Sequence, residues 1–180
     1  MAKSRIMAFR IKYLFLLLAF LSFSACEEDH DDDHNEKNTE EVIRFEREGS
    51  SILKGVKVPA GKSMYFASGM VTDVKDESKP EGDRNRLGNT YEQSLSTLKR
   101  IAEYLGEEGL SLKDVVAMKV YVAPDPENNN KPDFDGWFKA YGEYFGTAEN
   151  PNKVARSTIG VFTLVDPNKF IEVEVRAVYP

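Results

Sequence analysis

The stretch that decides the fold is Lys153 to Tyr179, KVARSTIGVFTLVDPNKFIEVEVRAVY. Its last part, FIEVEVRAVY at 170–179, alternates apolar and polar side chains almost without a break. Alternation with a period of two is typical of a strand that places one face against a core. The segment KVARSTIGVFTLV at 153–165 has the character of a second strand, and DPNK at 166–169 joins the two. The stretch therefore predicts a closing hairpin of two paired strands.

Two charged residues of this hairpin, Arg156 and Glu172, are the best candidates for chemistry in the chain. An arginine offers a two-pronged donor to a carboxylate, and a positioned glutamate can orient water by accepting its proton in a hydrogen bond. If Leu164 paired with Phe170 in a regular hairpin, the two candidates would lie about six residues, or roughly 20 Å, apart along the ladder. They can meet only if a bulge breaks the register or if two subunits share one pocket.

The preceding residues predict the remainder of one domain. Segments that alternate or are β-branched predict strands, and apolar residues at helical spacing predict helices. The expected strands are 42–47, 52–58, 63–71 and 114–122, the expected helices are 90–105 and 133–145, and the expected loops are 72–89 and 123–132. The order β-β-β-α-β-α-β-β predicts an α+β fold, with both helices on one face of a mixed or mostly antiparallel sheet.

Two local patterns refine this prediction. Thr90 and Gln93 have the spacing of a capping box, which predicts that the first helix begins at Thr90. Ser68 and Gly69 interrupt the third expected strand. A glycine inside a strand often marks a bulge or the close approach of a ligand, and simple packing or a bend is the other interpretation.

Composition and charge exclude several classes of function. The net charge of −6 divides into +4 in residues 1–26, −8 in residues 27–41 and −2 in the remainder, 42–180. A nearly neutral domain argues against a nucleic-acid partner, which normally requires a basic patch. Both histidines, His30 and His34, lie outside this domain, so a histidine-based triad or a buried zinc site is not expected in it. We also find no glycine-rich phosphate loop and expect neither metal nor cofactor.

The N-terminus has the features of an export signal. A basic segment, 1–12, precedes a short apolar run at 13–21, and small residues precede the single cysteine, Cys26. The apolar run is shorter than the roughly 20 residues that a transmembrane helix needs. The pattern resembles the lipobox of bacterial lipoproteins, in which the signal (here 1–25) is removed and the cysteine is acylated. An uncleaved signal anchor or a plain secreted protein is the alternative.

The residues after Cys26 have the composition of a tether. The segment 26–41 contains EEDHDDDHNEKNTEE, and so dense a charge block is expected to be disordered. His30 and His34 are candidates for weak binding of a divalent cation only. The predicted organisation is a signal peptide (1–25), a lipidated cysteine with an acidic tether (26–41) and a folded domain (42–180). Such a protein would face the periplasm or the cell surface, anchored in a membrane of the bacterial envelope.

An ordered series of segments resembles the RidA (YjgF-type) family of enamine and imine deaminases. The segments are ASG (67–69), EQSLSTLKRIAEYLG (92–106), LKDVVAMKVYV (112–122), FKAYGEYF (138–145), VARSTIGV (154–161) and IEVEVRAV (171–178). The resemblance implies a chorismate-mutase-like fold and a homotrimer with sites in clefts between subunits. It also implies that Arg156 holds the carboxylate of a 2-imino acid, that Glu172 places or activates water, and that Ser68 and Gly69 line the same cleft.

The sequence departs from the family pattern at the expected pocket wall. The tyrosine-bearing segment near the N-terminus of many deaminases is replaced by SILKGVKVPAG (51–61), and Phe138 stands where the family has asparagine. We therefore keep two hypotheses. One is hydrolysis of reactive imino or enamino acids, and the other is a non-catalytic trimer that binds a small carboxylate or a partner. Export favours the second, because the imines that the family clears arise from cytoplasmic enzymes.

Overall fold

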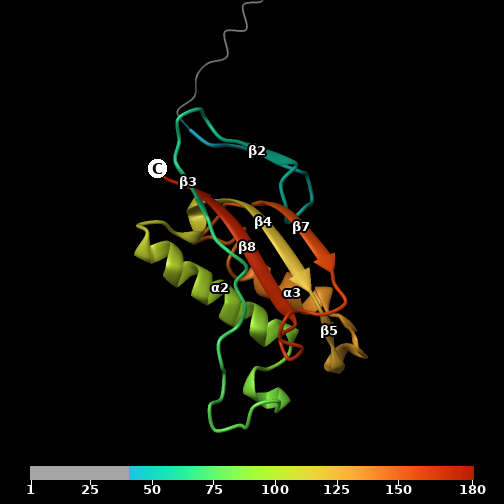
Figure 1. The fold of residues 1–180 in the computed structure, drawn as a ribbon. Coiled ribbons are helices and arrows are strands. Elements are labelled where there is room, and N and C mark those ends of the chain that lie inside the picture. The colour runs from blue at the N-terminus through green and yellow to red at the C-terminus, as the bar shows by residue number, and fades with distance from the viewer. Residues whose placement is uncertain (1–40) are drawn as a thin grey trace, which may run out of the picture. The chain divides into compact units, whose positions relative to one another are not determined.

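A computed structural model of the protein describes residues 41–180. Its main sheet has four strands in the order β3 (Met64–Phe66), β8 (Ile171–Val178), β4 (Val115–Val122) and β7 (Ala155–Gly160) (Figure 1). The pairs β3–β8 and β8–β4 are antiparallel, and β4–β7 is parallel. The sheet is therefore mixed, as predicted. The predicted signal peptide, Cys26 and all but the last residue of the acidic segment lie outside the described residues.

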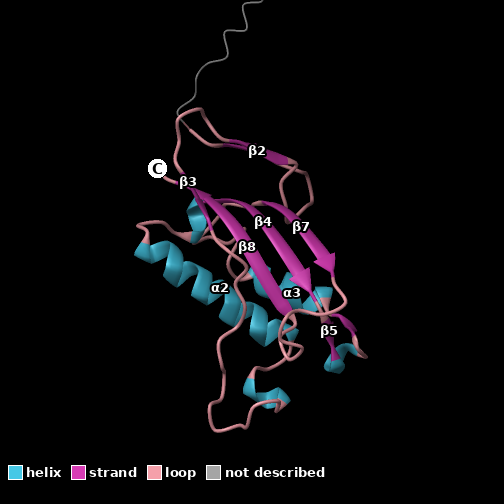
Figure 2. Cartoon of the chain, in the orientation of Figure 1, coloured by secondary structure: helices cyan, strands magenta, loops and turns pink. Residues whose placement is uncertain are grey.

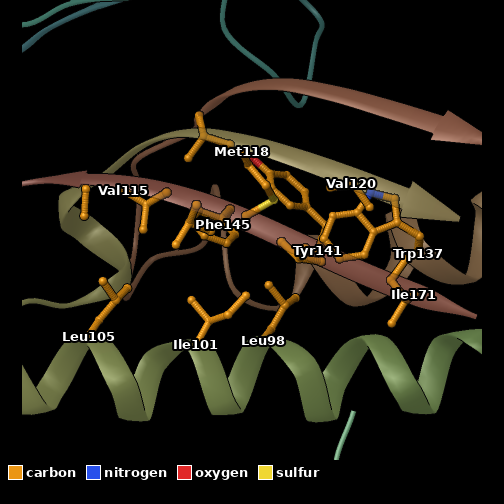
Figure 3. Packing of buried hydrophobic residues seen from close by; sticks show 14 of the residues in the cluster. Leu98, Ile101, Leu105, Val115, Met118, Val120, Trp137, Tyr141, Phe145 and Ile171 are labelled. Atoms are coloured by element: carbon orange, nitrogen blue, oxygen red, sulfur yellow. The ribbon is translucent and has the colours of Figure 1, made fainter. Parts of the chain in front are cut away.

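Two helices, α2 (Thr90–Glu107) and α3 (Phe134–Gly142), pack on the same face of this sheet (Figure 2). Their apolar stripes point toward the strands, as the close view in Figure 3 shows for Leu98, Ile101 and Leu105 of α2. The alternate residues of β4 and β8 complete the core, including Met118, Val120, Val122, Ile171, Val173 and Val175. The predicted α+β class, with both helices on one side, is confirmed.

The helix α2 begins where the sequence predicts it, but with a different cap. Asn89 is the N-cap residue, and it forms a reciprocal capping box with Glu92. Gln93, which the sequence pattern assigned to the box, is fully buried and binds the backbone of Gly88, Asn168 and Phe170 instead. Its amide therefore joins the start of the helix to the start of β8.

The predicted closing hairpin is wrong, because β7 and β8 lie on opposite sides of β4. The turn at 166–169 does form, with Lys169 donating its backbone N–H to Asp166, but it belongs to a longer loop that crosses the end of β4. The chain runs from β4 through α3 into β7, which is a crossover of the kind that joins parallel neighbours. The alternation of apolar and polar residues predicted both strands correctly, but it does not indicate which strands they pair with.

Further short elements surround this core. A separate two-stranded sheet joins β1 (Ile43–Phe45) and β2 (Gly55–Lys57). The segment 123–132, expected to be irregular, contains the short strands β5 (Pro124–Asp125) and β6 (Lys131–Pro132). The 3₁₀ turns are η1 (Arg84–Arg86), η2 (Leu112–Asp114) and η3 (Pro126–Asn128). The reversal in 123–132 uses left-handed backbone at Asn129 and Asn130, a conformation that asparagine tolerates better than most residues.

One arginine fastens the β1–β2 sheet to the domain. The guanidinium of Arg44 donates to the carbonyls of Val115 (3.0 Å), Lys153 (2.8 Å) and Lys113 (3.0 Å). Burial lowers the pKa of Arg44, and the nearby carboxylate of Asp114 partly opposes that change. Arg44 therefore connects β1 to three carbonyl groups that lie far from it in the sequence.

We therefore expect Arg44→Ala to lower the free energy of unfolding by roughly 2–4 kcal/mol, because three carbonyls lose a charged donor. Urea unfolding followed by circular dichroism measures the change. The exposed Arg47→Ala serves as the control and should shift the midpoint very little. Equal midpoints for the two variants would show that Arg44 does not fasten the sheet.

Candidate functional site

Arg156 lies on the edge strand β7 and points toward the helices. It pairs with Met118 of β4, whose side chain is in the core. Directly opposed residues share a face, so Arg156 shares that orientation. The guanidinium carbon stands 4.0 Å from the centre of the Tyr141 ring on α3. This geometry is a cation–π contact that an arginine forms readily with an aromatic face.

The Arg156 cation has no counter-ion among the described residues. Its Nη1 atom is buried and has no hydrogen-bond partner there. Burial lowers the pKa of Arg156, and the hydroxyl of Tyr141 opposes this only in part. Arginine nevertheless remains charged at neutral pH. A buried, unpaired cation is unfavourable, and an anion with a flat pair of oxygens would satisfy it.

Two further polar atoms beside Arg156 are also unsatisfied, and sequence reasoning missed both residues. Thr158 lies two positions further along β7, on the same face, and its Oγ1 is buried without a partner among the described residues. The indole Nε1 of Trp137 is in the same state, and its ring centre lies 5.6 Å from the Arg156 guanidinium carbon. The period-two pattern of β7 could have identified Thr158, because it places positions 156 and 158 side by side.

Phe138 and Phe134 form the outer edge of this arrangement on α3. The ring of Phe138 lies 5.2 Å from the Arg156 guanidinium carbon and is stacked on Phe134 at 6.4 Å. Phe138 is 45% exposed and Phe134 is 37% exposed, unlike the buried Trp137 and Tyr141 on the same helix. We name these two rings, Phe134 and Phe138, the aromatic wall.

Glu172 lies on the opposite face of the sheet from Arg156. It pairs with Tyr121, while its chain neighbours Ile171 and Val173 are fully buried against the helices. Its side chain therefore points to the face without helices. No hydrogen bond or ion pair engages its carboxylate within residues 41–180. This carboxylate is thus free to bind water or a ligand.

Ser68 and Gly69 lie beside Glu172 in a bulge. The backbone N–H of Ala67 bonds to Val175 and that of Met70 bonds to Val173, so residues 68 and 69 together replace one residue of a regular ladder. A Cβ atom on Gly69 would come within 2.8 Å of the carboxyl carbon of Glu172. The bulge, one of the interpretations of Gly69 from the sequence, is therefore present, and Gly69 makes room for the Glu172 side chain.

In the structure the candidate residues from the sequence form two separate groups. Glu172, Ser68 and Gly69 are on the open face, and Arg156 is on the helix face of the edge strand. From strand spacings, the Cα atoms of Arg156 and Glu172 are about 14 Å apart, two strands across and three residues along. The hairpin estimate of roughly 20 Å is corrected, but the two side chains still cannot share a ligand within one chain.

Gly69→Ala is expected to act on this arrangement without unfolding the protein. The added methyl group would force the Glu172 side chain into another rotamer, whereas the backbone at Gly69 has no left-handed φ to strain it. We expect the unfolding midpoint to change little and any activity that depends on Glu172 to fall about tenfold or more. Gly55→Ala is a matched control, because a Cβ at Gly55 meets no atom. Equal activity of the two variants would contradict a role for the Glu172 position.

The open face of the sheet also carries a depression of about 420 Å³. Its charged and polar lining comes from Lys54, Lys119, Arg156, Ser157, Glu174 and Arg176. Two of these charges are paired, because Glu174 accepts a hydrogen bond from Tyr121 at 2.9 Å and lies 3.8 Å from Lys119. The hydrogen bond to Glu174 raises the pKa of Tyr121. Glu172 is not part of this lining.

Residues 41–180 contain neither a candidate metal cluster nor a candidate membrane-spanning helix. No group of three or more histidine, cysteine, aspartate or glutamate side chains there is arranged to hold a metal ion. Within the same residues, every helix is too short or too polar to cross a membrane.

Comparison with known proteins agrees with this fold. The mixed sheet with two helices on one face defines an α+β protein of the chorismate-mutase-like type. A family model described as endoribonuclease L-PSP matches residues 60–179. The chain belongs to this family, whose members are also called YjgF or Rid proteins. No curated protein sequence is similar enough to count as a match.

Several solved structures are similar to this chain in fold. The Rid-family protein YyfB from Yersinia pestis is 21% identical, with 77% of this chain and 98% of that chain covered and a TM-score of 0.57. E. coli TdcF with bound serine is 22% identical, with 68% and 85% covered and a TM-score of 0.51. A putative translation initiation inhibitor from Vibrio vulnificus is 24% identical, with 76% and 94% covered and a TM-score of 0.50.

Proposed function

We propose that this protein binds the carboxylate of reactive 2-imino or enamino acids at Arg156 and hydrolyses them to 2-keto acids. The observation that carries the proposal is the half-buried guanidinium of Arg156, whose buried Nη1 has no hydrogen-bond partner and which has no counter-ion within residues 41–180. Tyr141 holds it from one side at 4.0 Å. A carboxylate that binds in the plane of such a fork satisfies the buried donors and is oriented by two hydrogen bonds.

The chemistry requires one further group, a base for water. The carboxylate of Glu172 accepts a proton as water attacks the carbon of the C=N bond, giving a tetrahedral aminoalcohol. For a substrate that enters as the protonated iminium, the same proton then passes to the nitrogen of the neutral aminoalcohol. The C–N bond breaks as the hydroxyl gives its own proton to Glu172 and becomes the keto group, and ammonia leaves with that proton as ammonium. The reaction consumes one water molecule and needs no oxidant or reductant. The electrophilic imine carbon keeps the barrier modest, so orientation and one base are sufficient.

Because the two groups are separated within one chain, we propose that a second copy of the chain completes the site. Arg156 lies on the edge strand β7, and Glu172 lies on the open sheet face. We propose a homotrimer in which Arg156 of one subunit meets Glu172, Ser68 and Gly69 of the next. In its support, the open sheet face presents apolar side chains such as Phe66 and Ile159, which are 63% and 43% exposed. A ring of identical heterologous contacts would create one such site at each interface.

Among the similar structures, E. coli TdcF was crystallised with bound serine. Serine, like a 2-imino acid, carries a carboxylate next to a carbon that bears nitrogen. This supports a ligand of that class for the site that we propose at Arg156. The family description also contains the word endoribonuclease. We do not extend that activity to this chain, because the sequence 42–180 has a net charge of only −2 and lacks histidine.

The test couples the purified full-length protein to an amino-acid dehydratase that releases 2-imino acids. The decay of the imine to keto acid is followed in the presence and absence of the protein. Acceleration that disappears in Arg156→Ala supports the proposal. No acceleration over buffer with several imino acids would refute hydrolysis, and acceleration that survives Arg156→Ala would refute the site.

A non-catalytic trimer that binds carboxylates is the second candidate. It is favoured by one observation: within residues 41–180 no carboxylate forms an ion pair or hydrogen bond with Arg156, so a single chain holds only half of a catalytic site. A thermal melt with small carboxylates separates the candidates, because any ligand that binds the native state raises the melting temperature. Stabilisation by carboxylates without imine hydrolysis would establish the binding protein.

A further inference from the structure

The surroundings of Arg156 contain a fixed apolar surface as well as a cation. Phe138 and Phe134, the aromatic wall, are stacked at 6.4 Å, and Phe138 lies 5.2 Å from the Arg156 guanidinium carbon. Both rings remain partly exposed, at 45% and 37%, although they belong to a helix whose other aromatic residues are buried. Two partly exposed aromatic rings beside a charged group are typical of a ligand site with a polar end and an apolar end.

The aromatic wall is held in place from β7 and β6. A Cβ atom at Gly160 would come within 3.3 Å of the Phe134 ring and of Pro132, so the absence of a side chain at Gly160 lets the ring lie close against the strand. Gly160, Thr158 and Arg156 all face α3, because they are spaced by two along β7. The wall, the hydroxyl of Thr158 and the guanidinium therefore line one surface between β7 and α3.

We propose that this site selects carboxylates whose side chain is aromatic or branched aliphatic over those with a very small side chain. The inference rests on the proposed binding of a 2-imino acid at Arg156. In such an acid the side chain begins two bonds from the carboxylate carbon, which is within reach of a ring 5.2 Å from the guanidinium. A phenyl or isobutyl group would cover the aromatic wall, whereas a methyl or methylene group would leave it in water.

The size of the preference follows from the apolar surface removed from water. One additional methylene buried in an apolar pocket strengthens binding by about 10-fold or more. A side chain of three or four carbons strengthens binding further, but the gain is smaller where part of its surface stays exposed. For a wall that covers only one side of the ligand we expect a preference of about 10- to 100-fold.

The experiment uses 2-oxo acids, which are stable analogues with the same carboxylate and the same side chains. Pyruvate, 4-methyl-2-oxopentanoate and phenylpyruvate are titrated into the full-length protein by calorimetry. The single tryptophan, Trp137, has its ring centre 5.6 Å from the Arg156 guanidinium carbon, so its fluorescence reports independently on binding of the aliphatic acids. The variant Phe138→Asn removes the nearer ring of the wall. Phe45→Asn is the matched control, because Phe45 is 49% exposed and lies on β1.

The expected result is that 4-methyl-2-oxopentanoate and phenylpyruvate bind at least tenfold more tightly than pyruvate. Phe138→Asn should reduce this ratio about fivefold or more, and Phe45→Asn should leave all three affinities unchanged. Phe138→Ala serves in its place if the unfolding midpoint shows that the asparagine variant is not folded.

The outcomes separate this inference from the function on which it rests. Equal binding of all three acids, or a ratio that Phe138→Asn leaves intact, would overturn the preference and leave the carboxylate site standing. This is also the result expected if a neighbouring subunit covers the aromatic wall. Absence of binding by every acid would overturn both. A preference that depends on Phe138 in a protein that does not accelerate imine decay would overturn hydrolysis alone.

Discussion

Replacing Arg156 with methionine is expected to abolish carboxylate binding while leaving the fold intact or more stable. The free protein holds a buried guanidinium nitrogen without a partner among the described residues, and burial already lowers the pKa of this arginine. Methionine fills similar space above the Tyr141 ring without the cost of burying a charge. Truncating one partner of a buried charge pair costs about 2–5 kcal/mol, so affinity for 2-oxo acids should fall roughly 30-fold to more than 1,000-fold.

The free energy of unfolding of the Arg156→Met variant is expected to rise, although its affinity for carboxylates falls. Replacing poorly compensated buried charges by apolar groups stabilises proteins by about 1–4 kcal/mol in favourable cases, and we expect the lower part of that range here. Urea unfolding of Arg156→Met measures the change, and calorimetry with 4-methyl-2-oxopentanoate measures binding. An arginine with only a structural role would give the reverse: a destabilised variant with unchanged affinity.

Arg100→Met is the matched control. Arg100 also stacks on a tyrosine, with its guanidinium carbon 5.4 Å from the Tyr104 ring, but it is paired with Asp73 at 3.0 Å and lies on α2. Its loss should leave affinity unchanged and should not raise stability. If Arg156→Met and Arg100→Met changed affinity and the free energy of unfolding equally, the lack of a partner at Arg156 would not mark a binding site.

The contrast between these two arginines shows what the sequence can and cannot predict. Arg156 was identified from its position in a strand and from the family resemblance, and its place on β7 is confirmed. Its orientation was not predicted, because the sequence was interpreted as a hairpin with β8. Period-two alternation fixes which residues of a strand share a face, but the partner strand is set by the crossover through α3.

The helix α3 illustrates a second limit. Its aromatic residues follow a helical period, and burial of this face was the natural interpretation. Trp137 and Tyr141 are indeed buried, but Phe134 and Phe138 remain at the edge of the sheet, where β7 is the last strand. Which part of an apolar stripe extends past the sheet depends on strand order, which local sequence does not encode. Gly69 shows the favourable case, because a glycine inside a strand carries its own signal.

The second large effect concerns the sharing of the site between subunits. We expect Arg156→Ala and Glu172→Gln to be nearly inactive separately, with losses of about 100-fold or more for the base and for the carboxylate anchor. Co-expression of the two variants, purified through a different tag on each, should restore activity. In a ring where each site takes Arg156 from one subunit and Glu172 from the next, a mixed trimer that carries both tags keeps both groups intact at about a third of its sites.

A second mixture tests the shared site without relying on the recovery of activity by two inactive variants, provided that the doubly substituted chain is shown to enter the oligomer. Wild-type chains are combined in equal amounts with chains that carry both substitutions. If each chain held a complete site, about half of the full activity would remain, whereas a shared site leaves about a quarter. Mixing Arg156→Ala with Arg156→Met gives the baseline, because no site then regains its arginine. We expect the quarter if Arg156 of one subunit and Glu172 of the next form one site, and recovery at the baseline level in verified mixed oligomers would exclude a site built from these two residues.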